Sequence, residues 1–184
     1  TPPFFRPEHI AAAVQAGKHI FAEKPACVDP VGARSVMASA KKAEAKGLCF
    51  VAGTQRRHQR DYVATWQQVA EGKIGRIVGS NAYWNGGKGW YIRDPDPKWS
   101  ELEYMIRTWG NWTWFSGDHI VEQHVHNLDV INWFTGSHPV KASGSGSRIR
   151  RDFGNQYDNF NIDYTFQDGT HEHSQCRQIN GCSN

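Results

Sequence analysis

The sequence predicts an α/β layer with parallel strands, followed by an α+β region whose strands are mostly antiparallel. Two observations support this fold class. Between Pro7 and Gly53, segments with helical and strand periodicity alternate with very short connections, which is typical of parallel α/β units. After Gly53 the strand-like segments become closely spaced, and Asp168–Gly169 is a typical hairpin turn. With 184 residues, the chain is long enough for one domain or two incomplete ones.

The first region is expected to contain two helices and two strands. Pro7 favours the first turn of a helix and Gly17 favours its end, whereas Pro25 ends the strand that follows. Asp29 and Pro30 form a cap and first-turn pair for a second helix that runs to Gly47. The expected elements are helix Pro7–Ala16, strand His19–Ala22, a helix from Pro30 to Gly47 and strand Leu48–Ala52.

The second region mixes helices with several strands. We place the boundary between Gly53 and Thr54, which gives predicted domains at 1–53 and 54–184. The segment Asn85–Ser100 is broken by Gly and Pro and is expected to be a long loop. The other expected elements are helix Asp61–Glu71, strand Arg76–Trp84, helix Asp118–Phe134 and strands Val140–Arg150, Tyr157–Phe166 and Thr170–Ile179.

Composition excludes two classes of partner. Lys plus Arg is 21 and Asp plus Glu is 18, and this excess of +3 is too small to indicate a nucleic-acid-binding surface. No apolar run reaches the roughly 18 residues of a membrane helix, so no membrane partner is expected.

The four cysteines form no CxxC pair. Cys27 and Cys49 lie in or beside segments expected to be buried, so free thiols are favoured, while pairing of Cys176 with Cys182 stays open. The chain begins at Thr1 without a signal-peptide pattern, so a processed or partial chain is expected. Cytoplasmic and periplasmic locations both remain possible.

The first candidate site is Glu23-Lys24-Pro25, which follows the first predicted strand. Open parallel sheets bind ligands at the carboxyl ends of their strands. An ammonium group there could stabilise a developing alkoxide, and its partial burial could bring the pKa of the lysine toward neutrality. The alternative is an ordinary solvated pair between Glu23 and Lys24.

The second candidate site is one stripe of the helix predicted from Asp118. Glu122, His126, Asp129 and Trp133 follow the spacing i, i+4, i+7 and i+11. The imidazole of His126 can exchange a proton near neutral pH, and the Glu122 carboxylate one turn earlier could orient it. The alternative is an amphipathic helix whose polar face meets water.

The histidines of the second region raise the alternative of a metal site, but their spacing does not favour one. His124 and His126 would point to nearly opposite sides of a helix, which is poor geometry for sharing a metal. His171 and His173 would share a strand face, but no third ligand lies at a suitable spacing, and cross-strand pairing explains them equally well.

The aromatic residues suggest a surface for a polyhydroxylated ligand. Tryptophan and tyrosine rings could stack on sugar C–H faces, with hydrogen bonds from Asn111 and Arg107. Arg57 and its neighbour Arg56 could line a crevice, although solvation explains them equally well. Core packing is the alternative for each ring. The rings considered are Tyr83, Trp84, Trp90, Tyr91, Trp109, Trp112 and Trp114.

Two motifs resemble the glucose-fructose oxidoreductase, inositol dehydrogenase and MocA (Gfo/Idh/MocA) family. Residues 16–25, AGKHIFAEKP, resemble its AGKHVFxEKP segment. Residues 116–129, SGDHIVEQHVHNLD, resemble its DxxxHxxD helix, with Glu122 where many members have aspartate. The two matches occur in the family's order.

This resemblance implies a fold and an activity. The fold would be the C-terminal half of a Rossmann-type parallel sheet domain, followed by an α+β domain with a mainly antiparallel open sheet for substrate binding and homo-oligomer contacts. The activity would be NAD- or NADP-dependent hydride transfer to or from a sugar, cyclitol or related polyol. Glu23, Lys24 and Pro25 would contact the cofactor, Lys24 and His126 would be catalytic with Glu122 beside them, and the carbohydrate-like substrate would contact Arg57, Trp109, Asn111, Trp112 and His126.

No GxGxxG motif occurs in the sequence, although this motif cradles the pyrophosphate in the family. We therefore expect a fragment that lacks the first half of the Rossmann domain and further sheet strands after Asn184. Such a fragment is expected to bind NAD weakly or not at all and to be inactive alone. Two alternatives stay open: an NAD-dependent glycosidase of the same fold, and a non-catalytic carbohydrate-binding module.

Overall fold

The computed structural model describes residues 1–87 and 94–183, and their contacts divide into two compact units. Unit 1 holds the described residues of 1–53, 90–122 and 152–156, and unit 2 holds the others. The predicted boundary between Gly53 and Thr54 is one of the places where the chain passes between the units. That two separate domains meet there stays a prediction, and each unit is described by itself.

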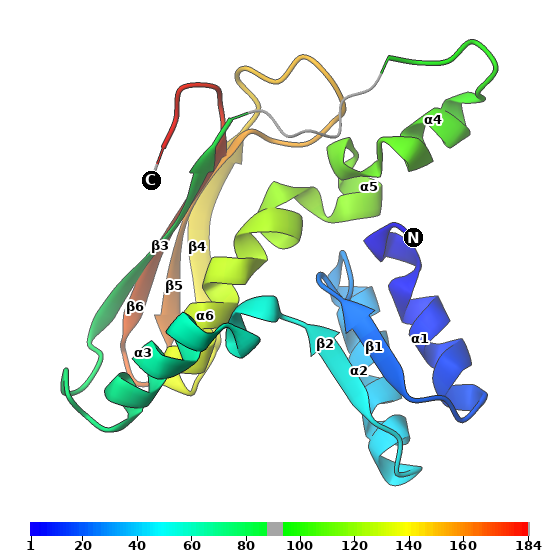
Figure 1. Cartoon of the computed structure of the whole chain (residues 1–184). Helices are drawn as coiled ribbons and strands as arrows, with labels where there is room; N and C mark the ends of the chain where they lie inside the picture. Colours follow the sequence, from blue (N-terminus) through cyan, green and yellow to red (C-terminus); the bar gives the residue numbers. More distant parts are fainter. Residues whose placement is uncertain (88–93, 184) are drawn as a thin grey trace. The chain divides into compact units, whose positions relative to one another are not determined.

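Unit 1 contains a parallel strand pair and two helices, as the sequence predicts (Figure 1). Ile20 of β1 pairs with Phe50 of β2. Apolar side chains of both helices and of the strands form its core: Ile10, Val14, Ala22 and Ala43, flanked by Ile20, Val36, Leu48 and Phe50. The elements are η1 (Pro3–Phe5), α1 (Arg6–Gln15), β1 (Ile20–Glu23), α2 (Pro30–Ala45) and β2 (Phe50–Gly53).

The predicted ends of α2 are confirmed. Asp29 is its N-cap, and its Oδ1 accepts a hydrogen bond of 2.6 Å from the backbone N–H of Gly32. Gly47 has a φ of +67°, the left-handed conformation that ends helices at little cost for glycine. Short-range signals of this kind set the boundaries of α2.

Unit 1 also contains helical segments that the sequence reasoning missed: α4 (Glu101–Arg107), η3 (Trp109–Asn111) and α5 (Thr113–Ser116). The signal that could have found α4 is Ser100, whose Oγ accepts a hydrogen bond of 3.2 Å from the N–H of Glu103. In the predicted loop Asn85–Ser100, residues 94–100 form no helix or strand, and β3 includes Asn85 and Gly86. Trp90 and Tyr91 lie outside the described residues.

Unit 2 contains a four-stranded sheet in the order β3-β6-β5-β4, beside which α6 lies in Figure 1. β3 and β6 are parallel, whereas the β6–β5 and β5–β4 pairs are antiparallel, so the predicted mainly antiparallel sheet is confirmed. The Asp168–Gly169 turn is also confirmed, with a φ of +83° at Gly169. The elements are η2 (Gln55–His58), α3 (Arg60–Ala70), β3 (Gly79–Gly86), η4 (Ile120–His124), α6 (Val125–Thr135), β4 (Pro139–Ser147), β5 (Asn159–Phe166) and β6 (His171–Gln178), with η4 shared between the units.

The helix predicted over Asp118–Phe134 is confirmed in its extent, but its first part is not a regular α-helix. Gly117 and Asp118 have φ values of +76° and +73°, so the helical residues follow directly on a left-handed turn. η4 is a π-helix, and the regular α-helix begins only at Val125. Glu122 therefore lies on the π-helix, and the predicted α-helical stripe starts at His126.

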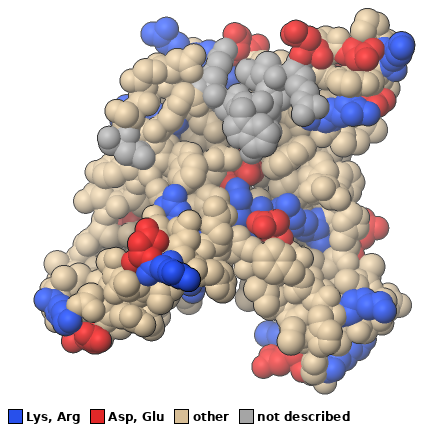
Figure 2. Space-filling model, in the orientation of Figure 1, with Lys and Arg blue, Asp and Glu red and all other residues tan. Residues whose placement is uncertain are grey.

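Three further findings concern the cysteines, the helices and the charges. All four cysteines are free, but Cys49 is exposed, so its predicted burial is wrong. In the part of the chain that the structure describes, no helix has the length and apolar composition needed to cross a bilayer. Acidic and basic side chains are interspersed on the face seen in Figure 2, as expected for a net charge of +3.

Candidate functional site

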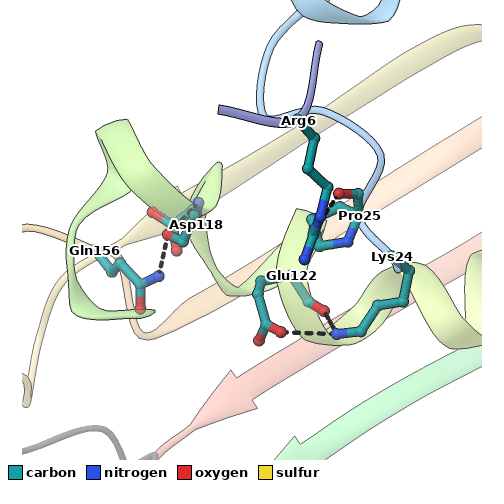
Figure 3. A network of polar contacts seen from close by, with 7 residues as sticks. Arg6, Lys24, Pro25, Asp118, Glu122 and Gln156 are labelled. Atoms are coloured by element: carbon teal, nitrogen blue, oxygen red, sulfur yellow. Dashed lines mark hydrogen bonds and ion pairs between the residues drawn. The ribbon is translucent and has the colours of Figure 1, made fainter. Parts of the chain in front are cut away.

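Lys24 follows β1 and forms a buried ion pair with Glu122 of the π-helix. Its Nζ donates one hydrogen bond of 2.7 Å to Oε1 of Glu122 and another to the backbone carbonyl of the same residue (Figure 3). The two side chains are only 14% and 7% exposed. Glu23 is exposed, so the partner of Lys24 is not its neighbour but a residue 98 positions away.

Burial makes this pair energetically demanding. Removing a carboxylate and an ammonium from water costs several kcal/mol per ion, and hydrogen-bonded pairing offsets most of this cost. Loss of either partner would leave the other charge buried and uncompensated. The pair therefore fixes the Lys24 amine at the carboxyl end of a parallel strand.

The π-helix begins at a tightly packed turn. A Cβ atom on Gly117 would lie 2.9 Å from the carbonyl oxygen of Val28, so only glycine fits there. The turn is held by Ser116, whose Oγ accepts hydrogen bonds from the Asp118 N–H at 3.1 Å and from Nε2 of Gln156 at 2.7 Å. These buried contacts keep the start of the π-helix against the segment that follows Lys24 and Pro25.

Arg6 is a third charged group of this cluster, and the sequence reasoning missed it. Its guanidinium donates a hydrogen bond to the carbonyl of Pro25, which follows a cis peptide bond (Figure 3). Burial lowers the pKa of Arg6, while the nearby carboxylates of Glu23 and Glu122 raise it. No periodicity marks Arg6, because its position at the start of α1 gives no hint of what the side chain contacts.

His126 belongs to unit 2 and lies at the start of α6. Its imidazole stacks on the indole ring of Trp84, with 5.6 Å between ring centroids and 24° between planes. Lys24 and Glu122 belong to unit 1, so the predicted convergence of Lys24 and His126 stays a prediction.

Asp129 and Trp133, the other stripe residues on α6, both contact Arg57. The guanidinium of Arg57 forms two hydrogen bonds of 2.8 Å to the Asp129 carboxylate, and these raise the pKa of Arg57. The same guanidinium lies 5.8 Å from the ring centroid of Trp133. This face of α6 therefore packs against η2 rather than facing only water.

The predicted substrate residues of the tryptophan-rich segment lie in unit 1. Asn111 is only 1% exposed, and its Nδ2 donates a hydrogen bond to the Thr108 carbonyl. Trp112 donates from Nε1 to the hydroxyl of Thr108 and packs edge-on against Phe153. Trp109 is half-buried in the adjoining turn. These contacts are internal to unit 1, and substrate binding by the three residues stays a prediction.

Two other histidines of unit 2, His124 and His171, have side-chain partners. Nε2 of the buried His124 lies 2.8 Å from the Ser174 hydroxyl, and burial, with a smaller effect of Arg56, lowers the pKa of His124 to about 4. His171 pairs with Asp163 at 2.9 Å, the cross-strand alternative for this residue. Among the residues that the structure describes, no group of three or more histidine, cysteine or carboxylate side chains could hold a metal.

Comparison with known protein families gives two matches. The model of the GFO/IDH/MocA C-terminal domain matches residues 62–181, and that of the oxidoreductase family with an NAD-binding Rossmann fold matches residues 1–52.

Comparison with individual proteins gives matches to longer chains. A 2,7-anhydro-N-acetylneuraminate hydratase of Mediterraneibacter gnavus is 21% identical over 91% of this chain and 41% of its own length. The structure of an oxidoreductase domain protein from Kribbella flavida superposes with a TM-score of 0.81, at 24% identity, over 100% of this chain and 48% of that one. A myo-inositol 2-dehydrogenase from Lactobacillus plantarum has a TM-score of 0.73 and 25% identity, over 99% and 51%. The chain thus spans about half the length of these proteins or less.

Proposed function

Since the chain belongs to the Gfo/Idh/MocA family of oxidoreductases, we propose that it forms part of a nicotinamide-dependent dehydrogenase acting on a sugar, cyclitol or related polyol. The observation that carries the proposal is the buried Lys24–Glu122 pair, which holds an amine at the carboxyl end of a parallel strand. The similarity to a myo-inositol 2-dehydrogenase supports a polyol as the substrate class.

The carboxyl edge of the β1–β2 pair is suited to the nicotinamide end of the cofactor. Glu23 and Gly53 pair at the carboxyl ends of β1 and β2, and a Cβ atom on Gly53 would come within 2.9 Å of the Glu23 Cα. This close-packed edge, with Lys24 and Pro25 next to it, suits the nicotinamide end. The sequence contains no GxGxxG turn for the pyrophosphate, so these 184 residues alone provide only part of the site. The bound cofactor would supply the hydride acceptor.

Two side chains would handle the substrate hydroxyl. In the proposed reaction, the His126 imidazole takes the hydroxyl proton as the carbon that bears this hydroxyl loses hydride and becomes a carbonyl carbon. The Lys24 ammonium donates a hydrogen bond to the same oxygen and stabilises the negative charge that develops there. Glu122 acts through Lys24, because its carboxylate and its carbonyl both hold the amine.

The test uses the complete polypeptide in which this sequence occurs, assayed with a panel of polyols by the absorbance of reduced nicotinamide. Lys24→Ala and His126→Ala are each expected to lower kcat by about 100-fold or more, as for loss of a positioned proton-transfer group. Matched controls are Lys73→Ala and His138→Ala, which change exposed residues. Full turnover in both site variants would refute the proposal.

A second candidate is a reaction without net oxidation, such as hydration or glycoside hydrolysis. The similarity to a hydratase favours it. Mass spectrometry of the products, run beside the absorbance assay, separates the two candidates. Product formed without accumulation of reduced nicotinamide would replace the dehydrogenase assignment with the second one.

A further inference from the structure

The surroundings of His126 in unit 2 contain a ring stack that no motif predicts. Trp84 lies on β3 and His126 on the first turn of α6, and their rings are nearly parallel with centroids 5.6 Å apart. In a stack of this kind the indole covers the face of the imidazole and not the ring edge, where both nitrogens lie.

The residue next to each ring ties α6 to β3. Asn127 follows His126, and its Nδ2 donates a hydrogen bond to the carbonyl of Tyr83, which precedes Trp84. Because these neighbours are bonded to each other, the two ring-bearing residues are held in one register. The stack is thus built into the packing of α6 on the sheet.

Arg56 of η2 contacts both Asn127 and Trp84. Its guanidinium donates to Oδ1 of Asn127 and to the hydroxyl of Tyr62, at 3.0 Å for the latter. The guanidinium carbon also lies 5.5 Å from the ring centroid of Trp84, within range of a cation–π contact. Trp84 therefore contacts both a cation and an imidazole, which restricts its own side-chain motion.

We propose that Trp84 is a positioning residue, which fixes the plane of the His126 imidazole so that one ring nitrogen points toward the substrate hydroxyl. The proposal rests on the proposed function, in which His126 exchanges that proton. An imidazole whose χ2 torsion is broadly distributed spends little time in the productive orientation, and a flat aromatic surface narrows this distribution. Phenylalanine can preserve such a stack, whereas alanine cannot.

The experiment compares Trp84→Phe and Trp84→Ala in the complete polypeptide, with Trp66→Phe as a control at a stacked tryptophan of α3. NMR spectra of the imidazole protons, assigned by their loss in His126→Gln, report the stack directly through the ring current of Trp84. In the parent protein these protons are expected upfield of their position in Trp84→Ala. In turnover assays, Trp84→Ala should lower kcat roughly 10- to 100-fold with little change in KM, and Trp84→Phe should restore most of it.

The outcomes distinguish the positioning role of Trp84 from the proton-exchange role of His126. Unchanged imidazole shifts in Trp84→Ala, or equal losses of kcat in the alanine and phenylalanine variants, would overturn the positioning role. Full turnover in His126→Gln would refute the proposed function of His126 while leaving the NMR evidence for the stack intact. Circular dichroism confirms that each variant is folded before these comparisons are made.

Discussion

Replacing Glu172 by glutamine is expected to change how the free energy of unfolding depends on pH. Glu172 lies on β6 and is only 1% exposed, and its Oε1 has no hydrogen-bond partner among the described residues. Burial raises the pKa of Glu172 to about 7 from an ordinary value of 4.5. His124 is fully buried, and burial lowers its pKa to about 4 from 6.5.

The two groups act on stability in opposite directions. Between pH 4.5 and about 7 the folded state holds an extra proton on Glu172, so the free energy of unfolding falls as pH rises. Between about pH 4 and 6.5 the unfolded state holds an extra proton on His124, so the free energy rises with pH. At about 1.4 kcal/mol per pKa unit, each shift corresponds to roughly 3 kcal/mol. Over the shared pH range the two contributions should nearly cancel.

Urea denaturation followed by circular dichroism, repeated from pH 4 to 7.5, measures this balance. Relative to the parent protein, Glu172→Gln should add a rise of about 3 kcal/mol across this range, because the contribution of His124 is no longer opposed. His124→Gln should add a fall of similar size. Glu103→Gln, at a more exposed position on α4, is the control. A Glu172→Gln profile parallel to that of the parent protein would refute the reasoning.

Two further predictions concern unit 2. Burial by itself would raise the pKa of Asp158, but hydrogen bonds from the N–H groups of Arg150, Ile149 and Arg151 and from the Asn159 side chain lower it overall. Asp158→Ala should therefore lower the free energy of unfolding by about 2 kcal/mol or more at pH 7. The loss should be smaller at acidic pH, well below the ordinary carboxyl pKa of 3.8, because the parent carboxylate takes up a proton there. Urea titrations at neutral and acidic pH check this. Arg57→Lys should lower the free energy of unfolding by about 1 kcal/mol, because lysine cannot form both hydrogen bonds to Asp129. A double-mutant cycle with Asp129→Asn should give a coupling energy of that size. A coupling energy of zero would count against a structural role for the pair.

Elements whose ends depend on neighbouring residues were predictable from the sequence. The Asp29 cap and the Asp168–Gly169 turn each act over three or four residues, so the letters alone identify them. The parallel pairing of β1 with β2 also followed, because a short helical crossover leaves few alternatives. These local rules account for the fold class.

The site could be predicted only in part, because its contacts join distant residues. Sequence spacing placed Glu122 one α-helical turn before His126, as the residue that orients it. The π-helix and the left-handed Gly117–Asp118 turn around Glu122 leave no mark on apolar periodicity. Glu122 also hydrogen-bonds to Lys24, a partner that no local pattern could indicate. Its action on His126 stays a prediction.

The burial of Glu122 bears on why a lysine follows β1. A carboxylate this buried needs a hydrogen-bonded cation, and the Lys24 amine also bonds to the Glu122 carbonyl on the π-helix. Arg6 adds a second cation near the same carboxylate and bonds to the carbonyl of Pro25, the residue after Lys24. Glu23 also lies near Arg6, so two carboxylates and two cations make up the cluster around the Lys24 amine. An ammonium has three N–H donors, of which Glu122 accepts two, and the proposed function assigns the third to an oxygen that gains negative charge.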